Sequence, residues 1–259
     1  MTCGAARIME RIVGRIPVRE SLRAGKRSAR RLFVLHDGTG LDEIAAMAQG
    51  VPVERCSRRE LDVLAEGVVH QGVVLEADPL PILNAGEWAK GPFPEDALVV
   101  ALDGIEDPHN FGAIVRSTAA CGGLAVIFGK HHAAPVSPVS VKSATGAMEW
   151  IDLVQATNLV RALQVLQGQG FWIAGLDPQG PQTLWDADLR GRTALVIGGE
   201  GKGIRRLVME TCDFLLRIPL TGPITSLNAS VSAGIALTEC LRQRGQPRCA
   251  AKESRPQGA

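Results

Sequence analysis

The sequence predicts an α/β protein made of two units, and three observations support this class. Short apolar runs alternate with helical patterns along most of the 259 residues, as in a sheet covered by helices. One run, ALVVAL at 97–102, is apolar throughout, which is typical of a parallel strand buried on both faces. A segment at 78–95 with four prolines and two glycines separates the two series. We therefore expect a small unit at 12–77, a linker at 78–95 and a larger unit at 96–245.

The composition excludes several classes of protein. The net charge is only +1 and hydrophobic residues make up 46% of the chain, which is typical of a soluble globular protein. No apolar run approaches the roughly 20 residues that a membrane-spanning helix needs. The six cysteines have no CxxC spacing, which argues against zinc and for a reduced compartment. We expect a cytoplasmic protein without a metal, whose natural start is either Met1 or Met9.

The first unit alternates strand and helix patterns. Ser57 and Glu60 have the spacing of a capping box, which predicts that a helix begins after Ser57. In order, we expect a helix near 17–25, a strand at 30–37, a helix at 41–50, a strand at 52–56, a helix at 57–67 and a strand at 68–77 interrupted by Gly72.

Basic residues are concentrated at both ends of the chain. Residues 1–35 hold nine Lys or Arg against two acidic residues, and the segment from Arg242 onward holds five against one. The first of these segments includes a cluster formed by Lys26, Arg27, Arg30 and Arg31. Such a cluster is compatible with RNA binding, although basic faces are often merely solvated. We expect the polar tail, 246–259, to be disordered.

The second unit also alternates strands and helices, which predicts an open parallel sheet with helices on both faces. We expect a strand at 97–102, a helix within 103–123, a strand at 124–129, a helical segment at 137–150, a helix at 158–170, a strand at 171–177, a strand and glycine loop at 193–203, a helix at 204–212, a strand at 213–220 and a closing helix from Ser226. Ligands of such sheets bind at the carboxyl ends of the strands.

The closing helix has an unusual first half. Leu227, Val231, Ile235 and Leu237 are expected on its apolar side, but 229–234 is nearly all small or hydroxylated. Small side chains allow another backbone to pass close by, and an Asn or Ser at a helix start presents polar groups to a ligand.

Two further stretches at strand ends share this character. In the first, Asn110 is expected to cap a helix, Gly112 permits a close backbone approach, and Arg116 either contacts a phosphate or oxygen nucleophile or forms a surface salt bridge. The second, GGEGKGI at 198–204, lacks both the Walker spacing and GxGxxG. By itself it is equally consistent with a tight turn that exposes Glu200.

Taken together, three segments resemble a known family in their order and spacing. DPHNFGAIVRSTAACG (107–122), LVIGGEGKGI (195–204) and IPLTGPITSLNASVSAGIAL (218–237) resemble the three motifs of SpoU-type RNA ribose 2′-O-methyltransferases, which belong to the SPOUT superfamily. The first unit, with GRIPVRESL at 14–22 and HQG at 70–72, is similar to the small ribosomal-protein-like substrate-binding domain of the subgroup that methylates a guanosine in large-subunit rRNA.

This resemblance implies a fold, a cofactor and partners. It implies that the carboxyl-terminal segment forms a trefoil knot, a rare exception to unknotted topology. It also implies that S-adenosylmethionine binds near Gly198, Ile218 and Leu227, that the substrate is RNA, and that the enzyme is a homodimer with active sites near the dimer interface.

The resemblance also assigns the catalytic positions. Asn110 and Arg116 match the first-motif pair, Glu200 the second-motif acid, and Ser226 and Asn228 the third-motif polar pair. A ribose 2′-hydroxyl is a poor nucleophile until its proton is drawn away. Because arginine normally stays protonated, we expect Arg116 to bind a phosphate and to orient or polarise the hydroxyl.

Other functions are compatible with parts of this pattern. A tRNA ribose methyltransferase is the first alternative, although the separate amino-terminal unit argues against it. A catalytically inactive RNA-binding knot protein is the second, and the intact motif residues argue against that. The missing GxGxxG excludes a nicotinamide dehydrogenase. His109, His131 and His132 lack carboxylate or cysteine neighbours at metal-binding spacing, which supports the absence of a metal.

Overall fold

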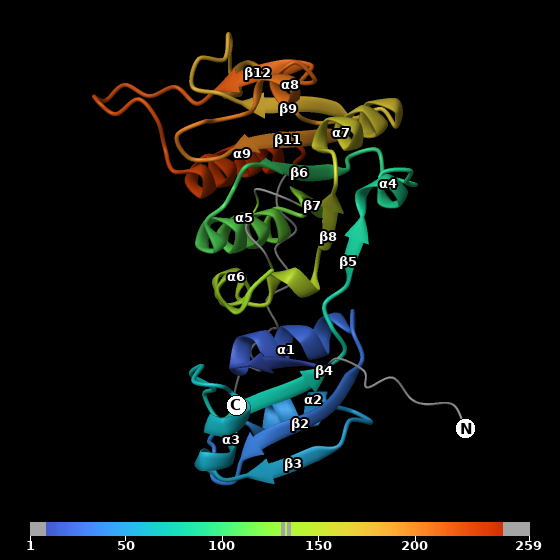
Figure 1. Ribbon diagram of the computed structural model, residues 1–259, viewed down its shortest axis with the longest axis vertical. Coiled ribbons are helices and arrows are strands. Elements are labelled where there is room, and N and C mark those ends of the chain that lie inside the picture. Colours follow the sequence, from blue (N-terminus) through green and yellow to red (C-terminus); the bar gives the residue numbers. More distant parts are fainter. Residues whose placement is uncertain (1–8, 131–132, 134–135, 246–259) are drawn as a thin grey trace, which may run out of the picture.

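The computed structural model describes residues 9–130, 133 and 136–245, which form two α/β units joined end to end (Figure 1). The tail predicted to be disordered, 246–259, and both His131 and His132 lie outside the described residues. Within the described part, no helix has the length and apolarity that crossing a membrane requires.

The amino-terminal unit is a four-stranded sheet with helices on both faces. Its strands are β1 (Glu10–Val13), β2 (Ala29–Leu35), β3 (Val53–Cys56) and β4 (Val73–Ala77), in the order β1-β4-β2-β3. Only β2 and β3 run parallel. Helices α1 (Arg15–Ala24) and α2 (Asp42–Met47) pack on one face, and α3 (Arg58–Leu64) packs on the other.

Most of the predicted elements of this unit are present, with two differences. The capping box of α3 is confirmed, because Glu60 N donates to Ser57 Oγ and Ser57 N donates to Glu60 Oε2. Strand β1 was not predicted. It has only four residues, because Gly14, with φ +103°, ends it, and so short a strand gives little pattern in the sequence. The predicted strand at 68–77 begins only at Val73, because the residues before it form a turn in which Gly72 has φ +88°.

The carboxyl-terminal unit contains an eight-stranded sheet. In chain order its strands are β5 (Ile82–Asn84), β6 (Leu98–Asp103), β7 (Ala125–Gly129), β8 (Asp152–Ala156), β9 (Trp172–Leu176), β10 (Gln182–Thr183), β11 (Thr193–Gly198) and β12 (Phe214–Arg217). The spatial order is β10-β12-β9-β11-β6-β7-β8-β5, and every pairing is parallel. The predicted linker, 78–95, is therefore only partly irregular, since β5 within it pairs with β8.

Helices cover both faces of this sheet, as expected for strands as apolar as β6. The helices are α4 (Ala85–Trp88), α5 (Pro108–Ala120), α6 (Pro138–Ala144), α7 (Leu159–Gly168), α8 (Arg206–Met209) and α9 (Ala229–Gln243), with 3-10 turns η1 (Ala147–Glu149) and η2 (Leu184–Asp186). Buried residues of α5 and α9 form a core on one face, and those of α4, α7 and α8 form a core on the other.

The closing helix differs from its prediction in start and in buried face. Helix α9 begins at Ala229 and is capped by Asn228, so Ser226 and Leu227 precede it. Val231, predicted on the apolar side, is 49% exposed. The buried face is made instead of small residues together with Leu237: Ala229, Ala233, Ala236 and Cys240. These small side chains let α9 lie close against α5.

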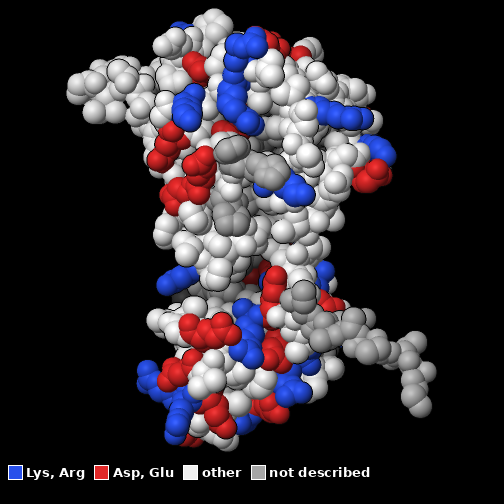
Figure 2. Space-filling model, in the orientation of Figure 1, with Lys and Arg blue, Asp and Glu red and all other residues white. Residues whose placement is uncertain are grey.

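Two residues of the predicted basic cluster, Lys26 and Arg27, join the two units. Arg27 is almost fully buried and pairs with Glu149 of η1 at 2.5 Å and with Glu10 at 2.6 Å. Lys26 donates to the carbonyl of Ile151 and pairs with Asp152. In Figure 1, α1 lies directly below α6 and the loops beside it. The face shown in Figure 2 carries charges of both signs over the lower unit and no continuous basic patch.

Candidate active site

A cavity of about 800 Å³ lies at the carboxyl ends of β9, β11 and β12, next to the start of α9. Four segments line it: 176–179 at the end of β9, 197–203 at the end of β11, 215–220 at the end of β12, and 225–229 at the start of α9. The location agrees with the rule that parallel sheets bind ligands at the carboxyl ends of their strands. It also brings together the second and third of the stretches singled out in the sequence.

The glycine loop after β11 is too tightly packed to accept side chains at its start. A Cβ on Gly198 would lie 2.3 Å from the carbonyl carbon of Gly203, and one on Gly199 would lie 2.1 Å from the carbonyl oxygen of Gly104. Gly203 N donates to Gly199 O at 3.0 Å, which closes the loop on itself. The main chain of this loop therefore lines the cavity directly.

An ion pair between a buried carboxylate and an exposed arginine holds the glycine loop against β6. Asp103, which ends β6, is 1% exposed and accepts hydrogen bonds from Arg205 N and Arg205 Nε, each at 2.7 Å. Its main-chain oxygen accepts from Gly199 N at 2.8 Å. We did not predict a role for Asp103. The signal was available, because a carboxylate ending an apolar parallel strand is rarely buried without a partner.

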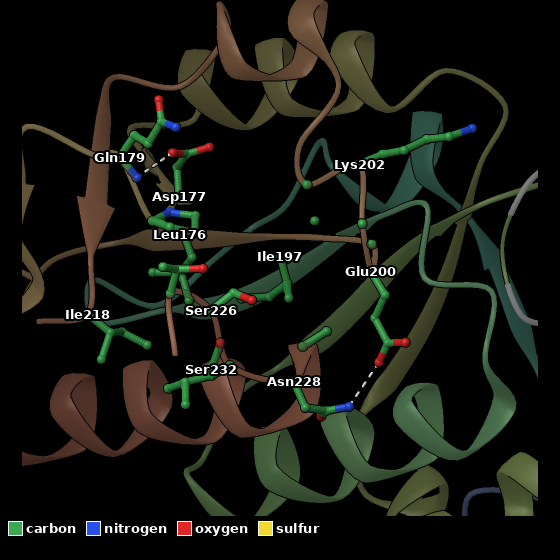
Figure 3. A pocket seen from close by; sticks show the side chains of 18 of the residues that line it. Leu176, Asp177, Gln179, Ile197, Glu200, Lys202, Ile218, Ser226, Asn228 and Ser232 are labelled. Carbon is green, nitrogen blue, oxygen red and sulfur yellow. Dashed lines mark hydrogen bonds between the residues drawn. The ribbon is translucent and has the colours of Figure 1, made fainter. Parts of the chain in front are cut away.

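Three predicted site residues form one hydrogen-bonded cluster at the mouth of the cavity. Asn110 Nδ2 donates to Glu200 Oε1 at 2.7 Å, Asn228 Nδ2 donates to the same oxygen at 2.9 Å, and Asn228 Nδ2 also approaches Asn110 Oδ1 at 3.1 Å. Figure 3 shows Glu200 pointing from the glycine loop toward Asn228 at the start of α9, whereas Lys202 extends away from them. A single carboxylate oxygen thus orients two amides from distant parts of the chain.

The local structure explains why these side chains meet. Asn228 Oδ1 caps α9 by accepting from Ser230 N and Val231 N, so its amide nitrogen faces outward toward Glu200. The prediction that Asn110 caps α5 is wrong. Asp107 caps that helix instead, because its side chain accepts a hydrogen bond from His109 N. Asn110 therefore lies inside the first turn, is 7% exposed, and directs its side chain to Glu200.

The other predicted residues divide into two groups. Gly198, Ile218, Ser226 and Leu227 all line the cavity. Among the described residues, those that line the cavity do not include Arg116. It lies six residues after Asn110 on α5, which corresponds to about 240° around the helix. Its side chain is exposed and makes one long contact, 3.5 Å from Nη1 to Thr145 Oγ1.

Sequence reasoning missed the loop after β9. Asp177 and Gln179 line the cavity, and Asp177 Oδ1 accepts from Gln179 N at 2.7 Å (Figure 3). Asp177 follows a strand and precedes a proline, as Asp107 precedes one in the first stretch. Cys212 lies beside Gly175 of β9, and burial together with the carboxylates of Asp213 and Asp103 raises its pKa to about 12. That thiol stays protonated at neutral pH and is a poor nucleophile.

We predict that Gly199→Ala damages the cavity. The added methyl group overlaps the carbonyl oxygen of Gly104, so the loop has to move. Overpacking of this kind costs about 1–3 kcal/mol in the free energy of unfolding. Urea unfolding and ligand titration measure the two effects. As control, Gly168→Ala places its methyl group in open space at the end of α7 and should leave ligand binding unchanged. Equal behaviour of the two variants would contradict the role assigned to the loop.

Comparison with known proteins gives matches over both units. Residues 97–238 match the SpoU rRNA Methylase family, and residues 11–83 match a domain described as RNA 2′-O ribose methyltransferase substrate binding. A relative from Pseudomonas aeruginosa, 23S rRNA (guanosine-2′-O-)-methyltransferase RlmB, is 46% identical over 211 residues, covering 79% of this chain and 82% of the relative.

Solved structures resemble the chain to different extents. The SpoU methyltransferase AviRb from Streptomyces viridochromogenes, crystallised with the cofactor AdoMet, has a TM-score of 0.77 at 25% identity, covering 91% of this chain and 90% of its own. The TrmH/SpoU tRNA modifying enzyme of A. aeolicus has a TM-score of 0.53 at 30% identity, covering 60% of this chain and 79% of its own.

Proposed function

Because the chain belongs to the SpoU rRNA methylase family, we propose that it transfers a methyl group from S-adenosylmethionine to a ribose 2′-hydroxyl of RNA, most specifically to a guanosine of 23S rRNA. The observation that carries this proposal is the cluster of Asn110, Glu200 and Asn228 beside a cavity at the strand ends. The relative from Pseudomonas aeruginosa bears the 23S rRNA guanosine activity in its name, and AviRb was crystallised with AdoMet.

The cavity has the features that a bound S-adenosylmethionine requires. Its volume of about 800 Å³ lies within the roughly 300–1,000 Å³ of ligand pockets. Leu176, Ile197 and Ile218 supply apolar surface for an adenine ring, and the main chain at Gly198 is open to polar contacts because no side chain fits there. Asp177 and Glu200 supply negative charge for a cationic ligand. When bound, the cofactor supplies an electrophilic methyl group.

The hydrogen-bonded cluster prepares the place where the ribose would lie. Glu200 Oε1 fixes the amides of Asn110 and Asn228, which leaves Glu200 Oε2 without a partner among the described residues. Ser226 lines the same cavity. Preorganised polar groups of this kind hold a hydroxyl in reacting position and lower the cost of orienting it. We assign this positioning to Asn110, Glu200, Ser226 and Asn228.

We further propose a homodimer in which Arg116 acts next to the cavity of the partner subunit. The support is that Arg116 is exposed and turned away from the cluster of its own chain. Exposed apolar side chains near the cavity, at Leu220, Ile224 and Val231, also indicate a covered surface. In this arrangement Arg116 binds a substrate phosphate and orients the 2′-hydroxyl without losing its own proton.

The remaining features of the proposal follow from the same family membership. We propose a trefoil knot formed by the segment around α9, a cytoplasmic location, and a division into a substrate-binding unit at 12–77 and a methyltransferase unit at 96–245. An rRNA substrate is preferred to tRNA, because the alignment with the A. aeolicus tRNA modifying enzyme covers 60% of this chain, whereas the alignment with the 23S rRNA methyltransferase of Pseudomonas aeruginosa covers 79% of it.

Mapping of 2′-O-methyl groups tests the substrate assignment. We expect cells that lack this protein to lose one 2′-O-methylguanosine in 23S rRNA and to keep their tRNA marks. Re-expression of the intact protein should restore the mark. Loss of a tRNA mark alone would transfer the assignment to tRNA, and an unchanged map of both RNAs would support a binding protein without catalytic activity.

A further inference from the structure

A second cavity, of about 840 Å³, lies in the amino-terminal unit. It is formed where the loop after β2 meets the start of α1, the start of α3 and the turn at 66–72 that precedes β4. The HQG motif at 70–72 lies in its wall, and nothing in the methyl-transfer chemistry uses that motif.

Hydrogen bonds hold the HQG turn in one conformation. The His70 ring is buried, and its Nδ1 accepts from Gly72 N at 2.9 Å, which leaves Nε2 protonated to donate to Asp62 at 3.1 Å. Gln71 Oε1 accepts from Arg15 N, and Gln71 O accepts from Arg15 Nε, each at 3.0 Å. The wall is thus built before any ligand arrives, which reduces the entropic cost of binding.

The same turn concentrates backbone strain. Glu66 (φ 49°) and Gln71 (φ 51°) are two of the three non-glycine residues with positive φ in the described part of the chain. Side chains rarely adopt this conformation, and it persists mainly at functional sites.

Several side chains that line this cavity are exposed and add nothing to the core of the unit. Val69 is 74% exposed and Val68 is 37% exposed, although both are apolar. Arg58 is exposed, and its side chain has no ion pair or hydrogen bond to another described residue. Asp37 is also exposed on the same cavity. By contrast, the basic cluster around Arg27 is occupied by ion pairs.

We infer that this cavity binds one unpaired nucleotide of the substrate RNA. Val68 and Val69 supply an apolar surface for the face of a base, Arg58 supplies a cation for its phosphate, and the Asp37 carboxylate accepts from an N–H group at the base edge. RNA is read mainly at unpaired nucleotides whose bases are turned out of the helix. This inference deepens the proposed function and rests on it.

The position of the cavity fits a substrate that reaches both units. In Figure 1 the arrowheads of β2, β9 and β11 point toward the same side of the molecule. The loop after β2 borders the second cavity, and the loops after β9 and β11 border the methyl-transfer cavity. One folded RNA can therefore insert an unpaired nucleotide into the cavity of the amino-terminal unit and present the ribose of another nucleotide to the methyl-transfer cavity.

Adjacent arginines give the first test. Arg58 lines the cavity and Arg59 does not, while both are exposed and carry the same charge. With the full-length protein and a 23S rRNA fragment, we expect Arg58→Ala to weaken RNA binding about tenfold. We also expect the slope of log affinity against log salt to fall by about 0.7, which corresponds to one lost single-strand phosphate contact. Arg59→Ala should change the affinity less than twofold. Equal effects of the two substitutions would overturn the inference.

Two exposed valines give the second test. Val69→Asp places a charge in the cavity, whereas Val63→Asp places the same charge on α3 at a site that is 71% exposed and outside the cavity. We expect Val69→Asp to raise the KM for RNA at least tenfold and to leave kcat and the affinity for the cofactor unchanged. Val63→Asp should change none of these three quantities. If Val69→Asp instead alters only the oligomeric state in light scattering, the cavity is a protein contact and the inference fails. Complete absence of methyl transfer by the unmodified protein would refute the proposed function, whereas the RNA-binding measurements judge the cavity separately.

Discussion

Glu200→Ala is expected to lower kcat for methyl transfer by at least about 100-fold, the scale of losing one preorganised polar group at a reacting centre. Its Oε1 accepts from both Asn110 and Asn228, so the substitution releases two amides at once. Asn110 is 7% exposed, and its Nδ2 would be left without this partner. Single-turnover rates with saturating RNA and S-adenosylmethionine measure the effect on the chemical step.

Two further variants separate positioning from a general effect of lost charge. Glu200→Gln keeps an oxygen that can accept from the two amides, so its rate should lie between those of the wild type and Glu200→Ala. Glu87→Ala removes an exposed carboxylate of α4 that pairs with Lys90, and it should leave the rate unchanged. A Glu200→Ala protein with the wild-type rate would show that the cluster has no part in the reaction.

Arg27→Ala is expected to destabilise the protein by about 3–5 kcal/mol, because it leaves a buried carboxylate without its partner. The side chains of Arg27 and Glu149 are 5% and 4% exposed, and they join the two units. Glu149 Oε2 is already buried without a hydrogen-bond partner among the described residues. Urea unfolding, followed by separate probes for each unit, measures the loss.

An exposed ion pair in the same unit provides the control. Arg55 pairs with Asp42 at 2.9 Å, with 46% and 83% of the side chains exposed, so Arg55→Ala should cost less than about 1 kcal/mol. Combining Arg27→Met with Glu149→Leu should recover most of the lost stability, since an apolar pair removes the unpaired charge. If Arg27→Ala behaved like Arg55→Ala, the buried pair would not hold the units together.

The sequence predicted the parallel sheet and the place of the site because both depend on local patterns. Apolar runs such as 97–102 identify buried strands, and polar or glycine-rich residues that follow them identify the carboxyl edge. The short β8 was missed, since Asp152 and Gln155 interrupt its apolar pattern. Strand β5 was missed for a different reason, because it is short and lies in a segment that contains four prolines.

Features that depend on packing between distant segments were not predictable. The capping role of Asn110 was wrong because Asp107, three residues earlier, offers the same chemistry and starts the helix first. Val231 was placed on the apolar side of α9 by its hydrophobicity, but the surface of α5 selects the small residues instead. The burial of Arg27 depends on Glu149, which is 122 residues away in the chain.

The position of the transferred methyl group in the product RNA shows whether this protein methylates a ribose. Purified protein is incubated with 23S rRNA and S-adenosylmethionine labelled in its methyl group, and the RNA is then hydrolysed in alkali, which does not cleave next to a methylated 2′-oxygen. We expect label in a single alkali-resistant dinucleotide that begins with guanosine, and label appearing there at least about 100-fold more slowly with Glu200→Ala. Label recovered in mononucleotides, where only a base can carry the methyl group, would contradict this expectation.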